Sequence, residues 1–135
     1  MSNNWFDRID VLPPYAGYRV TRGWYTTNDG EEVVAYSIEP KRSNGQVLMY
    51  LRGGTARIGD VRLPRLMQFA ARGFHVVAPV YRGNHGGTGK EDFGGEDLED
   101  VLSLYDRVQT SGRPIHALGF SRGGMMALSL ASERP

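Results

Sequence analysis

Apolar and polar positions along the chain alternate in blocks that predict strands first and then helices and strands in turn. The stretch GYRVTRGWYTT from Gly17 and the later EEVVAYSIEP each favour a strand, and the NDG at 28–30 between them favours a turn, so an antiparallel hairpin is predicted. After the polar turn KRSNG, the run Val47–Leu51 is continuously apolar. That pattern is typical of a strand covered on both faces.

The remainder of the chain alternates helix and strand. LPRLMQFAARG places Leu66, Met67 and Ala70 on one helical face, and FHVVAPV predicts a buried strand after it. GEDLEDVLSLYDRVQTSG has apolar residues at helical spacing, with Gly112 as a stop, and IHALGF predicts a last strand before a final helix. The predicted fold class is α/β, a mainly parallel sheet with helices on both faces, which binds ligands at the carboxyl ends of its strands.

The first sixteen residues differ from this pattern. Two prolines interrupt residues 1–16, which are predicted to be an irregular lead-in, with Trp5 and Phe6 packing onto the body. The length of 135 residues suits one domain or part of one, so residues 17–135 are expected to belong to a single domain.

The composition narrows the classes of function. The chain has sixteen basic and fifteen acidic residues, and its arginines are scattered along the sequence. Neither a nucleic acid nor a membrane surface is therefore predicted as a partner. The chain has no cysteine, which excludes disulfides, thiol catalysis and cysteine-ligated metal. No metal ion or cofactor is predicted. Because no secretory signal and no apolar stretch of membrane-spanning length is visible, a cytoplasmic location is expected.

The most specific chemical signal is the G-x-S-x-G formed by Gly119, Ser121 and Gly123. A serine hydroxyl is a weak nucleophile unless it is exposed, presented to a base and placed beside donors for an oxyanion. The motif falls between a predicted strand and a predicted helix, so Ser121 is expected to be exposed on a sharp turn, with the Arg122 N–H beside it at the helix N-terminus. The alternative is a turn that only joins strand to helix.

Two other glycine loops follow strands at the same predicted edge of the sheet. In LRGGT, the glycines let backbone amides approach a substrate closely, and Gly54 is favoured over Gly53 as a second oxyanion donor. The loop at 83–90 suggests phosphate or nucleotide binding as a rival hypothesis. Asn84 stands where the leading glycine of that motif belongs, and Glu91 stands where Ser or Thr would hold magnesium, so the rival is weaker.

The segments LRGG, APVYRGNHGGTGKEDFGGEDLEDV and IHALGFSRGGMMAL, in this order, resemble the first part of an α/β-hydrolase of the prolyl oligopeptidase-like family. The resemblance covers roughly residues 17–135. It implies a serine peptidase or esterase with Ser121 as the catalytic nucleophile, Gly54 and Arg122 as the oxyanion hole, and a peptide or small acyl ester as substrate. Where many members have His or Tyr before the paired glycines, this chain has Arg52.

The resemblance also implies an aspartate and a histidine later in the chain, and the sequence continues only to Pro135. Among its own histidines, His75 and His116 are expected to be structural, and His85 is disfavoured as the base because no carboxylate is predicted behind it. The remaining candidates to orient a histidine are expected instead to cap helices or to lie on the surface: Asp92, Asp97, Asp100 and Asp106. Neither lysine stands at a motif spacing from the serine.

Three functional hypotheses follow. The first is a serine hydrolase that is inactive as this isolated fragment, whose base comes from further sequence or another chain. The second is a truncated, non-catalytic interaction module that associates with itself or a partner through an exposed sheet edge, because the strand IHALGF would otherwise be an unpaired edge. The third is the phosphate-binding protein.

Overall fold

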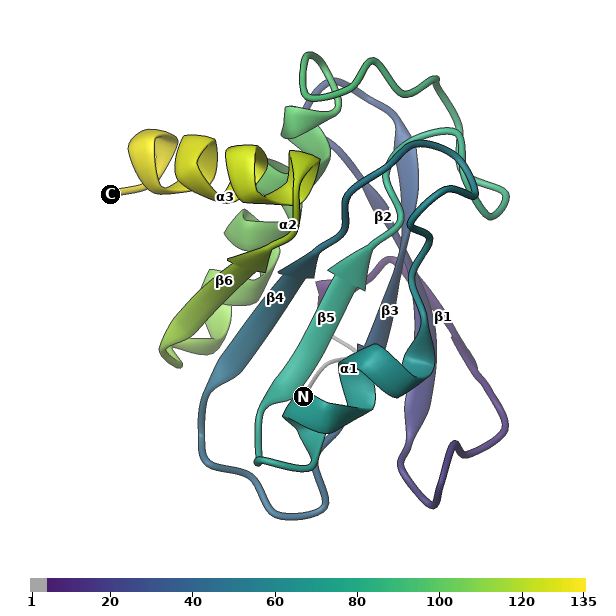
Figure 1. Ribbon diagram of the computed structural model, residues 1–135, viewed down its shortest axis with the longest axis vertical. Coiled ribbons are helices and arrows are strands. Elements are labelled where there is room, and N and C mark those ends of the chain that lie inside the picture. The colour runs from purple at the N-terminus through teal and green to yellow at the C-terminus, as the bar shows by residue number, and fades with distance from the viewer. Residues whose placement is uncertain (1–4) are drawn as a thin grey trace.

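The computed structural model describes residues 5–135, which form one six-stranded mixed sheet with helices on both faces (Figure 1). The strands follow one another across the sheet in the order β1-β2-β3-β5-β4-β6. Their bounds are β1 (Arg8–Val11), β2 (Val20–Thr26), β3 (Glu32–Ile38), β4 (Val47–Leu51), β5 (His75–Pro79) and β6 (Ile115–Gly119). The helices are α1 (Leu63–Ala70), α2 (Leu98–Val108), which continues as a 3-10 turn over Gln109–Ser111, and α3 (Arg122–Glu133).

The sheet is antiparallel at its amino-terminal end and parallel at its carboxy-terminal end. The predicted hairpin is confirmed as β2 and β3, which pair from Val20 opposite Ile38 to Thr26 opposite Glu32. β4 pairs in parallel with both β5 and β6. The arrowheads of β4, β5 and β6 therefore point the same way (Figure 1), and the loops that follow these strands leave from one edge of the sheet.

Helices on both faces explain why β4 and β5 are apolar throughout. All five residues of each strand are buried. On one face α2 and α3 pack against a cluster that includes Met49 and Leu51, and on the other Leu66 and Ala70 of α1 pack against Val76. The predicted α/β class is confirmed, with an antiparallel hairpin that leads into a sheet flanked by helices.

The amino-terminal segment differs from the prediction in one respect. Residues 8–11, predicted to be part of an irregular lead-in, form β1, which pairs antiparallel with β2. The sequence RIDV is too short and too charged to show an apolar face of its own, so the strand depends on pairing with its neighbour. Asp10 of β1 also forms an ion pair with Arg22 of β2, with 2.8 Å between Oδ2 and Nη2. Trp5 and Phe6 are buried on the body, as predicted.

β6 is the last strand at its side of the sheet, and within residues 5–135 it pairs with β4 alone. Three of its five residues are exposed, among them Leu118. Phe120 and Leu128, which follow in the chain, are also exposed. No helix within the described part of the chain is long and apolar enough to cross a membrane.

Candidate active site

Ser121 lies on a strained turn between β6 and α3. Its backbone has φ +56° and ψ −116°, an unusual conformation for a residue with a side chain, and the residue is exposed. Close packing holds the turn. A Cβ added to Gly119 would overlap the Gly123 carbonyl oxygen, and one added to Gly123 would overlap the Leu51 carbonyl oxygen. The strand–turn–helix predicted around the motif is present, with glycine where the backbones meet.

The loop after β4 lies directly against this turn. A Cβ on Gly53 would lie 2.7 Å from the Phe120 carbonyl oxygen and 3.1 Å from the Ser121 Cβ. Gly54 follows with φ +70°, a conformation that favours glycine. Within residues 5–135 no backbone or side-chain group accepts a hydrogen bond from the N–H of Gly54 or of Arg122. Both amides therefore lack an acceptor within these residues, and their role as oxyanion donors remains a prediction.

Two histidines are far from the serine or bound elsewhere. His75 begins β5, at the sheet edge opposite the glycine loops, and its Nε2 lies 2.8 Å from the Ser37 Oγ in a buried contact. Burial, aided by the nearby Arg113 charge, lowers the pKa of His75 to about 4, so the ring is neutral. His116, near the start of β6, binds the Gln46 side chain. Both positions agree with the expected structural role.

His85 has a carboxylate partner, Asp60, that the sequence did not predict. Its Nε2 lies 2.9 Å from Asp60 Oδ2, and its Nδ1 lies 2.9 Å from the Tyr36 hydroxyl. Asp60 belongs to the loop after β4 and Tyr36 to β3, so only the folded chain brings them together. Both ring nitrogens are occupied and neither bonds to Ser121. The expectation that no carboxylate lies behind His85 is wrong, but the ring still does not face the serine as a base.

The four aspartates divide into two groups. Asp92 accepts the N–H groups of Glu96 and Asp97 ahead of α2, and Asp106 pairs with Arg134 at the surface, much as expected. The expectation for the other two is wrong. Asp97 and Asp100 are fully buried and are paired with arginines, and Asp97 makes no side-chain cap although it stands at the N-cap of α2. Acidic residues are common in the first turn of a helix, so their positions in the sequence do not indicate which carboxylates are buried.

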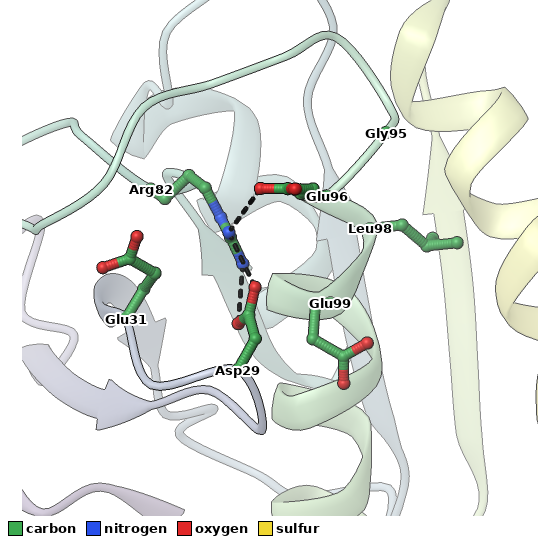
Figure 2. A pocket seen from close by; sticks show the side chains of 7 residues that line it. All are labelled: Asp29, Glu31, Arg82, Gly95, Glu96, Leu98 and Glu99. Carbon is green, nitrogen blue, oxygen red and sulfur yellow. Dashed lines mark hydrogen bonds and ion pairs between the residues drawn. The ribbon is translucent and has the colours of Figure 1, made fainter.

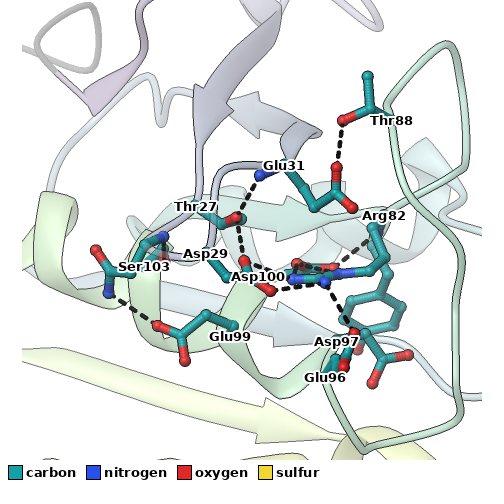
Figure 3. A network of polar contacts seen from close by, with 12 residues as sticks. Thr27, Asp29, Glu31, Arg82, Thr88, Glu96, Asp97, Glu99, Asp100 and Ser103 are labelled. Carbon is teal, nitrogen blue, oxygen red and sulfur yellow. Dashed lines mark hydrogen bonds and ion pairs between the residues drawn. The ribbon is translucent and has the colours of Figure 1, made fainter.

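Arg82 organises one buried network (Figure 3). It donates to Asp100 from Nε at 2.9 Å and from Nη2 at 2.8 Å, and its Nη1 lies 2.9 Å from Asp29 in the hairpin turn. Burial raises the pKa of Asp100 to about 6 against the stabilising bonds from Arg82, whereas the half-exposed Asp29 has a lowered pKa because Arg82 bonds to it. The network joins the hairpin to α2.

A pocket opens beside Arg82 and is acidic (Figure 2). Asp29 and the more distant Glu96 both pair with Arg82 there. Ser121 is not among its lining residues, which are Asp29, Glu31, Arg82, Gly95, Glu96, Leu98 and Glu99. The pocket is therefore an opening in the structural network, separate from the serine.

Three backbone amides of the loop at 83–90 are already bound within the protein. The Gly83 N–H donates to the Thr88 carbonyl, the Gly87 N–H to the Asn84 carbonyl, and the Thr88 N–H to Glu32 in β3. The Thr88 hydroxyl donates to the Glu31 carboxylate at 3.0 Å. A phosphate cradle needs free amides and tolerates no adjacent carboxylate, so this geometry opposes the phosphate-binding hypothesis.

A second buried network lies beneath the glycine loops. The sequence does not predict that its residues pair with one another. Arg52 and Arg122 are 1% and 2% exposed, and both guanidinium groups pair with Glu91. Their partners lie tens of residues away in the sequence, so no local spacing reveals the cluster.

Comparison with known proteins now identifies the family. A sequence profile described as the alpha/beta hydrolase family matches residues 51–134, from the end of β4 through the serine turn to the end of α3. The chain belongs to the alpha/beta hydrolase family. The chain is also 47% identical over 105 residues to a protein of Bacillus subtilis (strain 168) named uncharacterized peptidase YtmA, a match that covers 75% of the chain and 40% of that protein.

Solved structures share the fold of this chain. The esterase Pf2001 of Pyrococcus furiosus superposes with a TM-score of 0.71 at 19% identity, covering 93% of the chain and 52% of the esterase. Acetyl xylan esterase 1 from Thermoanaerobacterium sp. JW/SL YS485 gives 0.70 at 19% identity, with coverage of 95% and 49%. An alpha-beta serine hydrolase homologue from Coxiella burnetii gives 0.69 at 14%, with coverage of 96% and 59%. The chain thus spans about half the length of these structures, and less of the peptidase.

Proposed function

We propose that Ser121 is the nucleophile of a serine hydrolase that transfers an acyl group to water. The observation that carries the proposal is an exposed serine at φ +56° on a turn packed by Gly119 and Gly123, with the loop after β4 against it. Strain of this kind persists only where surrounding packing enforces it, and it is typical of functional positions.

The reaction divides into two steps. The Ser121 Oγ attacks the acyl carbonyl carbon while its proton passes to a histidine, and the negative charge that develops on the carbonyl oxygen is stabilised by the N–H groups of Gly54 and Arg122. The alcohol or amine then leaves with that proton. Water attacks the acyl-enzyme, gives its proton to the same histidine, and the acid is released as the serine is restored.

The base is proposed to lie outside the described residues. His75 and His116 are bound elsewhere, and His85 is bound by Asp60 and Tyr36. A histidine and its aspartate are therefore proposed to come from further sequence or from another chain. Without them, residues 1–135 alone are expected to be inactive.

For the substrate, we propose a peptide or a small acyl ester within a prolyl oligopeptidase-like subfamily. The motifs around both glycine loops support the subfamily, and the 47% identical relative is named a peptidase. The structural neighbours named esterases support the ester alternative.

The test is covalent labelling with a fluorophosphonate, applied to the longest polypeptide that the gene encodes and to residues 1–135 alone. We expect label on Ser121 of the long polypeptide, its loss in Ser121→Ala, and its retention in Ser132→Ala, a matched control further along α3. Residues 1–135 should label at least about 100-fold more slowly, because the base is missing. Absence of label on the long polypeptide contradicts the nucleophile, and equal labelling of both contradicts an external base.

Labelled protein can then be assigned a substrate class. Ester and peptide hydrolysis are compared with p-nitrophenyl acetate and an aminoacyl p-nitroanilide, each against Ser121→Ala. Turnover of the anilide supports a peptidase. Turnover of the ester alone supports an esterase.

A second candidate function is that of an interaction module. The observation that favours it is the exposed edge of β6 with Leu118, Phe120 and Leu128 around it. Such an edge is expected to make residues 1–135 self-associate, or bind a partner strand, with concentration-dependent mass in sedimentation. Leu118→Lys should favour the monomer, while Val11→Lys on the opposite edge strand should not. A monomer at all concentrations contradicts this candidate.

A further inference from the structure

Two buried arginines hold the carbonyl groups of the loop that packs on the serine turn. The Arg52 Nη1 donates to the Gly53 carbonyl at 3.2 Å and to the Ile58 carbonyl at 3.3 Å. The Arg122 Nη1 donates to the Gly54 carbonyl at 2.6 Å. Each end of Gly54 is therefore attached to a guanidinium group through its peptide unit.

These bonds determine where the amides point. A trans peptide is planar, with its N–H directed opposite to its C=O, and residues 5–135 contain no cis bond. The Gly54 N–H belongs to the peptide whose carbonyl Arg52 binds. It therefore points away from Arg52, and no described residue accepts it. A Cβ at Gly54 would overlap the Ile58 carbonyl oxygen, so the loop packs too closely there for any residue but glycine.

Glu91 couples the two arginines to the far side of the same loop. Its carboxylate binds the Arg122 Nη1 at 2.6 Å, lies 3.7 Å from the Arg52 Nη2, and accepts the Ala56 N–H at 2.7 Å. Partial burial opposes its charge, but the Arg122 bond and the other donors hold the pKa of Glu91 below its usual value. Glu91 is therefore ionised and connects the loop to both guanidinium groups.

Tyr81 completes the support of this cluster. Its ring centroid lies 4.5 Å from the Arg122 Cζ and 5.2 Å from the Arg52 Cζ, and its hydroxyl donates to the Arg52 carbonyl at 2.9 Å. A guanidinium presents planar donors in a fixed geometry, so such contacts restrict its orientation as well as its place.

The double role of Arg122 separates this cluster from an ordinary buried ion pair. Its backbone N–H is one proposed oxyanion donor, at the first residue of α3, while its side chain binds the peptide that follows the other donor, Gly54. One residue thus sets the spacing between the two amides.

We propose that Arg52, Glu91 and Arg122, the arginine clamp, are positioning residues that hold the Gly54 and Arg122 amides in the geometry of an oxyanion hole. The proposal rests on the proposed function of Ser121. Arg52 stands where related enzymes carry His or Tyr. In this chain its side chain supports the oxyanion hole by binding the Gly53 carbonyl, rather than by donating to the substrate.

The test measures ester hydrolysis by the longest encoded polypeptide, with the fraction of active protein determined by fluorophosphonate titration. Arg52→Lys, Arg122→Lys and Glu91→Gln are expected to lower kcat by about 10- to 100-fold with KM nearly unchanged, because the oxyanion forms only in the transition state and small misplacements are costly there. Arg82→Lys is the matched control, since Arg82 is equally buried and ion-paired, but its guanidinium pairs with Asp29, Glu96 and Asp100 rather than with the 53–59 loop. It should lower the melting temperature and leave kcat unchanged.

Unchanged kcat in the three variants, or an equal loss in Arg82→Lys, overturns the proposal. If the parent protein shows no Ser121-dependent hydrolysis, the proposed function fails first, and the clamp is decided by ¹⁵N-glycine spectra. Arg52→Lys and Arg122→Lys should then shift the Gly53 and Gly54 amide peaks by more than a linewidth, while Arg82→Lys should not. Unshifted peaks overturn the clamp independently of catalysis.

Discussion

Arg82 binds Asp100 through Nε and Nη2 at 2.9 and 2.8 Å, and the carboxylate is fully buried. The backbone N–H of Arg82 also donates to the same carboxylate at 2.7 Å. The pair therefore anchors the chain after β5 to the first turn of α2.

The first prediction concerns this pair. Arg82→Met should lower the free energy of unfolding by about 3–5 kcal/mol at pH 8, since it leaves a buried charge without its partner. The pKa of Asp100 is already raised to about 6 by burial and should rise further without Arg82. A carboxylate with a raised folded pKa favours folding as the pH falls, so the loss should be smaller at pH 5. Urea unfolding at both pH values measures it.

The control for that prediction is Arg134→Met, which removes a partly exposed pair with Asp106. It should cost about 1 kcal/mol or less. An Arg82→Met loss that is no larger than this, or that is larger at pH 5 than at pH 8, contradicts the account of the buried pair.

The second prediction concerns His75. Its pKa is lowered to about 4 in the folded protein by burial, against 6.5 when unfolded. The unfolded state then binds more protons between these values, so this group's stabilisation is complete above pH 6.5 and is lost as the pH falls toward 4. The difference corresponds to about 3 kcal/mol.

The measurement is the difference in unfolding free energy between the parent and His75→Gln as a function of pH, because Asp100 contributes the opposite slope between about pH 4 and 6. The parent's advantage should shrink by about 3 kcal/mol from pH 7 to pH 4. A constant difference for His75→Gln would disprove the assignment.

The third prediction compares the two glycines of the serine motif with the glycine that directly follows it. Gly123→Ala and Gly119→Ala should each destabilise by about 3 kcal/mol or more and slow labelling of Ser121, because the new Cβ overlaps a backbone carbonyl. At Gly124 the nearest atom lies 3.6 Å away, and the residue is helical. Gly124→Ala should therefore be neutral or stabilise by up to about 1 kcal/mol. Urea unfolding distinguishes them, and equal effects at all three positions would contradict the close-approach argument.

The fourth prediction concerns His85. Because Asp60 and Tyr36 occupy both of its ring nitrogens, His85→Ala should change the fluorophosphonate labelling rate of the long polypeptide by less than about 5-fold. Tyr36→Phe serves as the control that removes one partner and leaves the ring. A loss of more than about 100-fold in His85→Ala alone would identify this histidine as the base.

The sequence by itself determined the order of most elements and the turn on which the candidate nucleophile lies. Val47–Leu51 and FHVVAPV predict strands covered on both faces because an unbroken apolar run has no polar side to turn to water, and both strands are buried. The turn at Ser121 was also predictable, since glycines on either side and a change of period from strand to helix are local features. The strand over residues 8–11 was not, because it depends on pairing with β2.

Only the tertiary structure decided which polar side chains work together. Asp60 and His85 are 25 residues apart, and the Arg122 guanidinium reaches Gly54 across 68. Such pairs have no period or spacing, since a buried charge is satisfied by whichever opposite group the packed core brings to it. Asp97 and Asp100 show the same limit. Acids at a helix start look alike in sequence, and the fold alone determines which of them are buried against an arginine.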